Sequence, residues 1–133
     1  MKVLLVNGSP HKEGCTYTAL CEVEKALKQE GIETEIFWIG NKPISGCIGC
    51  RTCVSKKSCV FDDVVNEFVS KATDVDGFVF GTPVHYASAS GAMTSFIEYF
   101  TQLVVVEKMS LLINQLLVYV QLEEQVLLQH MIN

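Results

Sequence analysis

The first eighteen residues constrain the fold more than any other stretch of this sequence. Residues 2–6 contain the aliphatic and β-branched run VLLV (residues 3–6), which predicts a short strand buried on both faces. Turn-forming residues end this strand at positions 7–10, and a helix is predicted to begin near Cys15. A strand, a loop of small residues and a helix start are the parts of an anion site. The helix N-terminus presents unpaired N–H groups and a partial positive charge of about half an electron.

The sequence of the loop after this predicted strand limits which anions it could bind. It lacks the lysine-bearing P-loop pattern and the three-glycine dinucleotide fingerprint, so ATP and a Rossmann-type NAD site are both disfavoured. The hydroxyls of Ser9, Thr16 and Thr18 could donate to a phosphate without crowding it. The same pattern also fits an ordinary strand-to-helix connection without a ligand, and the local sequence leaves both interpretations open.

Composition indicates one globular domain. The 133 residues are 49% hydrophobic and 19% charged, with a net charge of −5, which excludes an intrinsically disordered chain. No basic run stands out for phosphate contacts, so we expect no nucleic-acid partner. No apolar stretch approaches the roughly eighteen residues that span a bilayer, and the N-terminal apolar run is too short for a signal peptide. We therefore expect a cytoplasmic protein without a membrane partner.

Strand and helix patterns alternate after the first loop. Helical apolar stripes cover residues 15–30, 61–73 and 92–100, and strand patterns cover residues 34–39 and 75–81. The order βαβαβα predicts an α/β fold with a parallel sheet and right-handed crossovers. In such sheets the ligand lies at the carboxyl ends of the strands, where the loops after the first and third strands meet.

Four of the six cysteines lie in one segment with regular spacing. The pattern is C-x2-C-x2-C-x5-C, formed by Cys47, Cys50, Cys53 and Cys59. Two consecutive C-x2-C steps let three thiolates converge from one tight turn, and the fourth returns after a short loop. That is ligand geometry for an iron–sulfur cluster or, less well, for zinc. The alternative is a loop whose thiols surround a substrate pocket without a metal, and spacing alone does not decide between them.

Three segments, in order, resemble the NADPH-dependent FMN reductase family of flavodoxin-like proteins. They are VLLVNGSPHKEGCTYT (residues 3–18), GCIGCRTCVSKKSCVFDD (residues 46–63) and GTPVHYASASGAMTSFIEYF (residues 81–100). The middle segment resembles the cysteine motif of the iron–sulfur flavoprotein subgroup. The resemblance covers about residues 1–100 and implies a flavodoxin-like, doubly wound parallel sheet of order 2-1-3-4-5.

The resemblance also implies cofactors and the residues that would hold them. The cofactor would be FMN, with NAD(P)H as co-substrate, a small-molecule electron acceptor and, from the cysteine motif, a 4Fe-4S cluster on Cys47, Cys50, Cys53 and Cys59. The phosphate contacts would be Ser9, His11, Cys15 and Thr16. The ring contacts would be Pro83, Val84, His85, Tyr86, Ser88, Ser90 and Gly91. Because the flavin carries the chemistry, no side chain is nominated as catalytic.

Residues 101–133 do not match the family and contain none of the nine glycines or three prolines. We therefore expect a flavodoxin-like FMN-binding domain over residues 1–100, incomplete after the third strand and its helix, followed by an apolar tail. A frameshift would explain the tail. If each true codon joined the last base of one present codon to the first two of the next, residues 120–133 could encode SARRAGTTATYDQ. That string resembles the family's third flavin-contacting segment.

Loss of the family's C-terminal half would leave the third strand as an exposed apolar edge of the sheet. We expect the tail to cover this edge as a helix over about residues 109–130, or a second copy to cover it. A homo-oligomer, either a dimer or a tetramer, is therefore expected. The third wall of the flavin site would be absent, which would weaken the activity.

Three functions follow from these observations. The leading one is an FMN-dependent NAD(P)H oxidoreductase of the flavin, quinone or nitro-compound reductase type, impaired by its altered C-terminus. The second is an iron–sulfur flavoprotein that carries single electrons, which iron bound by the four thiolates would distinguish. The third is an inactive, truncated flavodoxin-like fragment, which would bind no flavin.

Overall fold

A computed structural model describes the backbone of residues 1–108 and 117–122 and the side chains of residues 1–100. The elements in chain order are β1 (Lys2–Asn7), α1 (Cys15–Gln29), β2 (Glu33–Trp38), α2 (Thr52–Lys56), α3 (Val64–Ala72), β3 (Gly77–His85), β4 (Ser88–Ala89), α4 (Gly91–Lys108) and β5 (Leu117–Leu122). The predicted alternation of strands and helices is confirmed. Within these residues, no helix has the length and hydropathy needed to cross a bilayer.

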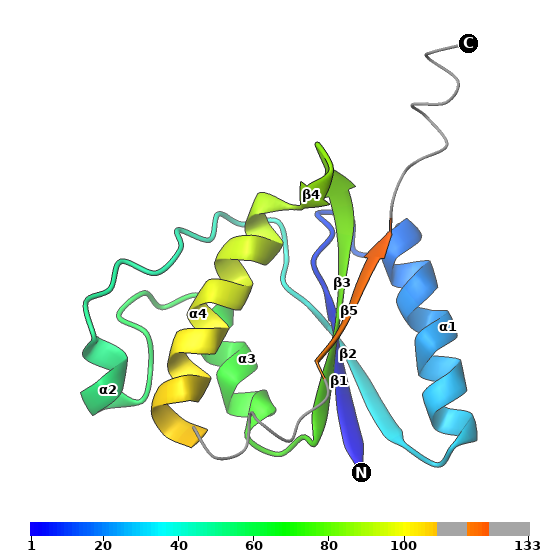
Figure 1. The fold of residues 1–133 in the computed structure, drawn as a ribbon, viewed down its shortest axis with the longest axis horizontal. Helices are drawn as coiled ribbons and strands as arrows, with labels where there is room; N and C mark the ends of the chain where they lie inside the picture. The colour runs from blue at the N-terminus through cyan, green and yellow to red at the C-terminus, as the bar shows by residue number, and fades with distance from the viewer. Residues whose placement is uncertain (109–116, 123–133) are drawn as a thin grey trace.

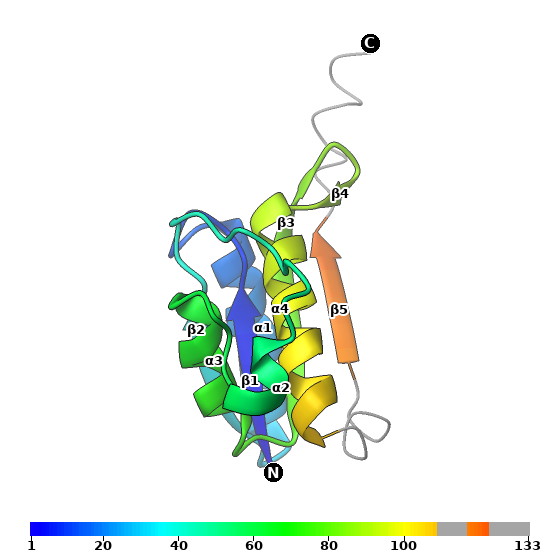
Figure 2. The same cartoon turned by 90° about the vertical axis from the view of Figure 1, so that its left-hand side faces the viewer.

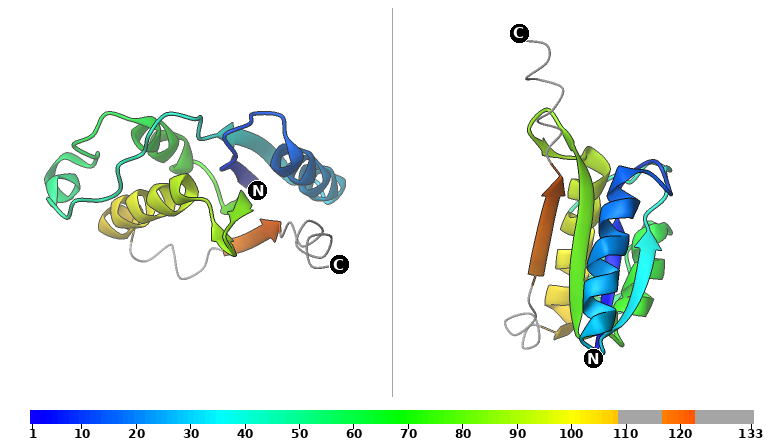
Figure 3. Two further views of the ribbon diagram at one scale, coloured as in Figure 1. Left: turned by 90° about the horizontal axis from the view of Figure 1, so that it is seen from above. Right: turned by 90° about the vertical axis from the view of Figure 1, so that its right-hand side faces the viewer.

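The main strands form a parallel sheet in the order β2-β1-β3, with β5 on the other side of β3 (Figures 2 and 3). Leu5 of β1 lies opposite Ile36 of β2 and Val79 of β3. The short strand β4 pairs antiparallel with the end of β3. Helix α1 covers one face of the sheet, and α3 and α4 cover the other (Figure 1). The predicted α/β, flavodoxin-like fold is thus confirmed.

Strand β5 corrects the expectation for the edge of β3. It runs parallel to β3, from Leu117 opposite Phe78 to Leu122 opposite Pro83. This is the place of the fourth strand in the 2-1-3-4-5 order. The predicted tail helix is wrong over residues 117–122, because a strand there supplies the hydrogen bonds that the edge of β3 would otherwise lack. The rest of that predicted helix lies outside the described residues.

Alternate residues of the strands enter two separate cores, one on each face of the sheet. On the α3–α4 face, the fully buried Phe68 contacts several rings, with centroids 5.2 Å from Phe37, 4.9 Å from Phe96 and 5.1 Å from Phe100. On the α1 face, Leu20 packs in a smaller cluster with Val3, Leu5 and Val79. Burial on both faces explains why β1 and β3 appear in the sequence as continuous apolar runs.

Candidate functional site

The carboxyl ends of β1 and β3 meet at one edge of the sheet. Asn7 lies opposite Gly81 in register, and the Gly8 amide donates to the Gly81 carbonyl at 2.8 Å. A Cβ at Gly8 would collide with the side chain of Met93 in α4. The absence of a side chain at Gly8 therefore lets the loop after β1 run directly against β3 and the start of α4. We term residues 8–14 the anion loop.

The buried amide of Asn7 spans the anion loop. Asn7 Oδ1 accepts from the Ser9 amide at 3.0 Å, and Asn7 Nδ2 donates to the Lys12 carbonyl at 3.0 Å. Ser9 then makes two further bonds, as its Oγ accepts from the His11 amide at 3.1 Å and its carbonyl accepts from Trp38 Nε1 at 2.8 Å. The Lys12 ammonium lies 5.8 Å from the Trp38 ring centroid, within cation–π range. The loop is therefore held by Asn7 next to it in the sequence and by Trp38 at the end of β2.

The residues predicted to contact phosphate differ in their exposure. Ser9 and Thr16 are buried, whereas His11 and Cys15 are exposed. Thr18 Oγ1 donates to the carbonyl of Gly14 at 3.2 Å, so its hydroxyl is engaged within its own helix. Gly14 is the N-cap of α1 and has no side chain that could accept from the first-turn amides. Those amides can therefore donate to an anion.

The residues predicted to contact the flavin ring form a β-hairpin at the same edge. Val84 pairs with Ala89, and His85 pairs with Ser88. The two turn residues, Tyr86 and Ala87, have positive φ angles of 52° and 62°. A two-residue hairpin turn of this kind requires left-handed backbone at both positions, which glycine and asparagine adopt more easily. The Tyr86 side chain is fully exposed and does not reach the cavity described below.

Ser90 joins the hairpin, α4 and the anion loop. Its buried Oγ accepts from the Met93 amide at 3.2 Å, which caps the N-terminus of α4. Thr82 Oγ1 lies 3.2 Å from the same oxygen, and Ser90 Oγ donates to the Gly8 carbonyl at 3.4 Å. The Ser90 hydroxyl thus shapes the edge of the sheet through bonds to the protein itself.

A cavity of about 200 Å³ opens where these segments meet. Its walls are Gly8, Pro10, Gly40, Asn41, Lys42, His85, Ser90, Gly91 and Ala92. Of the predicted ligand residues, only His85, Ser90 and Gly91 line it. The sequence analysis did not predict Pro10 or residues 40–42 as part of the site. Residues 40–42 could have been found, because parallel strands have their carboxyl ends at one edge of the sheet and these residues follow β2. Lys42 adds a positive charge to the wall.

These groups suit FMN in kind. The first-turn amides of α1 can donate to a phosphate, Lys42 adds a positive charge to the cavity wall, and the cavity between the anion loop and the hairpin has room for part of a flat ring. The fit of this site to FMN rests on its hydrogen-bond donors and its cavity. It does not rest on every predicted contact residue being in place.

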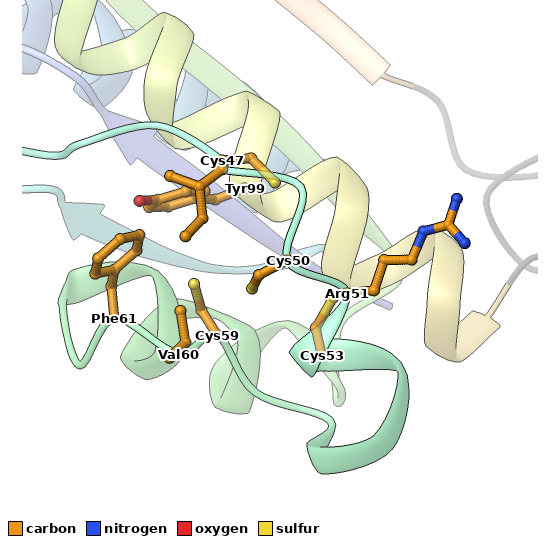
Figure 4. A pocket seen from close by; sticks show the side chains of 9 residues that line it. Cys47, Cys50, Arg51, Cys53, Cys59, Val60, Phe61 and Tyr99 are labelled. Carbon is orange, nitrogen blue, oxygen red and sulfur yellow. The ribbon is translucent and has the colours of Figure 1, made fainter.

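All four predicted metal ligands line one small pocket beside α4, which contributes Tyr99 to its wall. Cys47, Cys50, Cys53 and Cys59 surround it together with Ile48, Arg51, Val60, Phe61 and Tyr99 (Figure 4). We term residues 46–60 the cysteine loop. In the part of the chain that the structure describes, no three histidine, cysteine or acidic side chains lie close enough together to hold a metal ion. The donor set suits iron, whereas the positions of the thiols in this structure do not.

Side chains from α3 and α4 hold the cysteine loop. Glu98 Oε2 accepts from the Cys47 amide at 3.3 Å, and the hydroxyls of Ser45 and Tyr99 are 2.6 Å apart. From α3, the Asn66 side chain accepts from the Cys59 amide at 2.8 Å and donates to the Cys59 carbonyl at 3.2 Å. These partners were absent from the sequence prediction, because no local pattern links them to the cysteines.

Two of the thiols have shifted acidities. The hydroxyl of Thr52, 3.3 Å from Cys50 Sγ, lowers the pKa of Cys50 because it can donate to the thiolate. Burial raises the pKa of Cys59, because a thiolate is poorly solvated there. Both shifts favour a larger thiolate fraction at the exposed Cys50 than at Cys59.

Comparison with known proteins identifies the family. The model of the NADPH-dependent FMN reductase family matches residues 1–122. The chain belongs to this family. The match extends beyond the three segments that the sequence analysis used and includes β5.

Curated relatives are iron–sulfur flavoproteins. One from Methanocaldococcus jannaschii is 35% identical over 98 residues, which are 74% of this chain and 51% of the relative. One from Archaeoglobus fulgidus is 34% identical over 98 residues, or 74% of this chain and 44% of the relative. The chain thus spans about half the length of the curated relatives it matches.

Solved structures share the fold. A flavone reductase superposes with a TM-score of 0.56 at 24% identity, covering 75% of this chain and 30% of its own. An NADH:FMN oxidoreductase superposes with a TM-score of 0.53 at 13% identity, covering 96% of this chain and 83% of its own. These likenesses establish the flavodoxin-like architecture.

Proposed function

We propose that this chain binds FMN at the carboxyl edge of its sheet and acts as an NAD(P)H-dependent oxidoreductase on a small-molecule acceptor. The observation that carries the proposal is the meeting of three loops around the cavity of about 200 Å³, one of which is the anion loop that leads into the uncapped N-terminus of α1. Ser9, the first-turn amides and Lys12 would hold the phosphate. His85, Gly91 and residues 40–42 would border the ring.

The protein's own part is to bind and orient the cofactor. When bound, FMN supplies the redox chemistry, with NAD(P)H as the reductant. The Gly8 and Ser90 contacts keep the anion loop and the hairpin at a fixed separation. Lys42 contributes positive charge at the cavity, which favours an anionic ligand in a chain of net charge −5.

FMN titration of anaerobically purified protein tests this proposal. We expect flavin absorption bands that stay with the protein, and oxidation of NAD(P)H when an acceptor is added. Lys42→Gln should weaken FMN or NAD(P)H binding, more at low salt than at high salt, because it removes a charge at the cavity. Lys25→Gln, an exposed substitution on α1, is the matched control. A folded protein that ignores added FMN would favour the inactive-fragment alternative.

A second candidate function is that of an iron–sulfur flavoprotein. It is supported by the arrangement of Cys47, Cys50, Cys53 and Cys59 around one pocket. Binding a cluster would require the loop to draw the thiols together. Iron and sulfide assays after anaerobic reconstitution test it, with substitution of the four cysteines by serine expected to abolish binding. Cys21→Ser, in α1, should leave any iron content unchanged.

We further propose that the protein is a homo-oligomer, as either a dimer or a tetramer. Within the described residues, β5 pairs only with β3, so its other edge can accept a strand of a second copy. Light scattering during gel filtration measures the mass directly. A monomer over the whole concentration range would contradict this proposal without affecting the proposed cofactor.

A further inference from the structure

Asn7 is a fully buried polar side chain that lies beside the cavity without lining it. It is the last residue of β1, where the chain leaves the sheet. A buried polar side chain is costly unless its hydrogen bonds are made. Both ends of the Asn7 amide are satisfied within the anion loop, at Ser9 and at Lys12.

The two bonds of Asn7 join opposite ends of the loop. The Ser9 amide lies two residues after Asn7 and the Lys12 carbonyl five residues after it. The Ser9 amide is a donor and the Lys12 carbonyl is an acceptor. A single side chain that binds both must therefore offer one acceptor and one donor. Asparagine has both on one short side chain, whereas aspartate has only the acceptor and alanine has neither.

The bond to Ser9 has consequences further along the loop. Ser9 in turn accepts from the His11 amide through its Oγ and from Trp38 Nε1 through its carbonyl. The position of Ser9 therefore decides where the next amide and the Trp38 ring lie. Asn7 is the first member of this chain of contacts, and it reaches them from a rigid strand.

We propose that Asn7 is a positioning residue, which holds the anion loop in the shape that accepts the phosphate of FMN without touching the ligand. This inference rests on the proposed function, because FMN affinity is one of its two readouts. The other readout, the order of the loop in protein free of FMN, is independent of any cofactor.

The first measurement is amide hydrogen exchange of the wild type, Asn7→Ala and Asn7→Asp without FMN. In Asn7→Ala the Ser9 amide loses its acceptor, and we expect its exchange to accelerate about tenfold or more. In Asn7→Asp the acceptor remains, so the Ser9 amide should stay protected. Trp38, the only tryptophan, should change its emission in Asn7→Ala, because its partner is the Ser9 carbonyl. Val65→Ala, a fully buried α3 substitution, controls for general loss of stability.

The second measurement is FMN affinity by titration. We expect the Kd to rise about tenfold or more in Asn7→Ala, and to change less than about twofold in Val65→Ala. Asn7→Asp should also bind more weakly, because the Lys12 carbonyl has lost its donor. This loss should persist at high salt, which separates it from repulsion between the new carboxylate and the phosphate.

The outcomes separate the two proposals. Unchanged Ser9 exchange in Asn7→Ala would overturn the inference, and so would faster exchange with unchanged FMN affinity. If Asn7→Ala does not fold, unchanged affinity of Asn7→Asp at high salt overturns it instead. If the wild type itself binds no FMN, the proposed function fails and the role of Asn7 toward FMN fails with it. The exchange data then decide only whether Asn7 shapes the loop.

Discussion

The anion loop and the cysteine loop both carry predicted ligand groups, yet they are held in different ways. In the anion loop the bracing residue, Asn7, lies two and five positions from its partners. In the cysteine loop Glu98 lies 51 positions from Cys47, and just before this loop Ser45 is bonded to Tyr99, 54 positions away. The anion loop therefore combines bonds to its neighbours in sequence with bonds to Trp38, Gly81 and Ser90, whereas the bonds from Glu98 and Tyr99 form only when α4 has packed.

The two loops also differ in what they bury. Ser9 in the anion loop and Thr16 just after it are inside the protein, close to the sheet. The cysteine loop exposes large apolar side chains, with Ile48 64% and Val54 54% accessible. Few buried contacts mean a low free energy for local opening, so we expect the cysteine loop to open without unfolding the sheet.

The largest expected effect is on the free energy of unfolding, when a core side chain is truncated on either face of the sheet. Phe68→Ala removes the ring at the centre of the α3–α4 face and should cost about 3–5 kcal/mol, while Leu20→Ala on the α1 face should cost about 2–5 kcal/mol. Urea denaturation measures both. Hydrogen exchange should show the cysteine loop loosened mainly by Phe68→Ala and the anion loop mainly by Leu20→Ala. If either variant accelerated hydrogen exchange equally in both loops, the two loops would not depend on separate cores.

A smaller effect is expected from the contact that ties the cysteine loop to α4. Glu98→Ala removes the acceptor of the Cys47 amide and should lower the free energy of opening this loop by about 1 kcal/mol. The measurement is exchange of the Cys47 amide, with the Ser9 amide as internal reference. Glu98→Gln keeps an oxygen acceptor and should retain most of the protection. Opening of both loops together would show that they are coupled.

The hairpin beside the anion loop offers a stabilising substitution. Ala87 has a positive φ of 62°, a conformation that costs an L-residue free energy and costs glycine little. Ala87→Gly should therefore raise the free energy of unfolding by about 0.5–1 kcal/mol. Ala26→Gly, within α1, should lower it, since the backbone there is helical. A loss of stability in Ala87→Gly would contradict this account of the turn.

The smallest effect concerns an ion pair away from both loops. The ammonium of Lys71, 2.6 Å from Glu35 Oε1, lowers the pKa of Glu35 below its ordinary 4.5. The carboxylate therefore adds stability above the pKa of the unfolded chain, and this stability is lost as the pH falls from about 4.5 through the lower folded pKa. In Glu35→Gln the melting temperature should depend less on pH over that window. The change should be small because the pair is partly exposed, and Glu22→Gln, in a more exposed pair, should change less still.

The tail is the segment where prediction from sequence failed most clearly. We expected an apolar helix over about residues 109–130, or a second copy, to cover the edge of β3, but residues 117–122 form a strand beside it. The sequence LVYVQL suits either state by its apolar character, and the vacant edge of β3 decides for a strand. The frameshift hypothesis stays a prediction. Resequencing the gene tests it, and an open frame without the latent SARRAGTTATYDQ segment would refute it.

Sequence alone determined the α/β fold, the parallel sheet and the edge at which the loops after β1 and β3 meet. These follow from apolar periodicity and from turn formers such as those between Asn7 and Gly14, which act over a few residues. Tertiary structure alone decided that Lys42 lines the cavity, that Glu98 and Asn66 hold the cysteine loop, and that β5 covers β3. Apart from the bonds of Asn66, which lies seven positions from Cys59, these contacts join residues distant in the chain. Local pattern carries no record of them, because they form only when the packed elements bring those residues together.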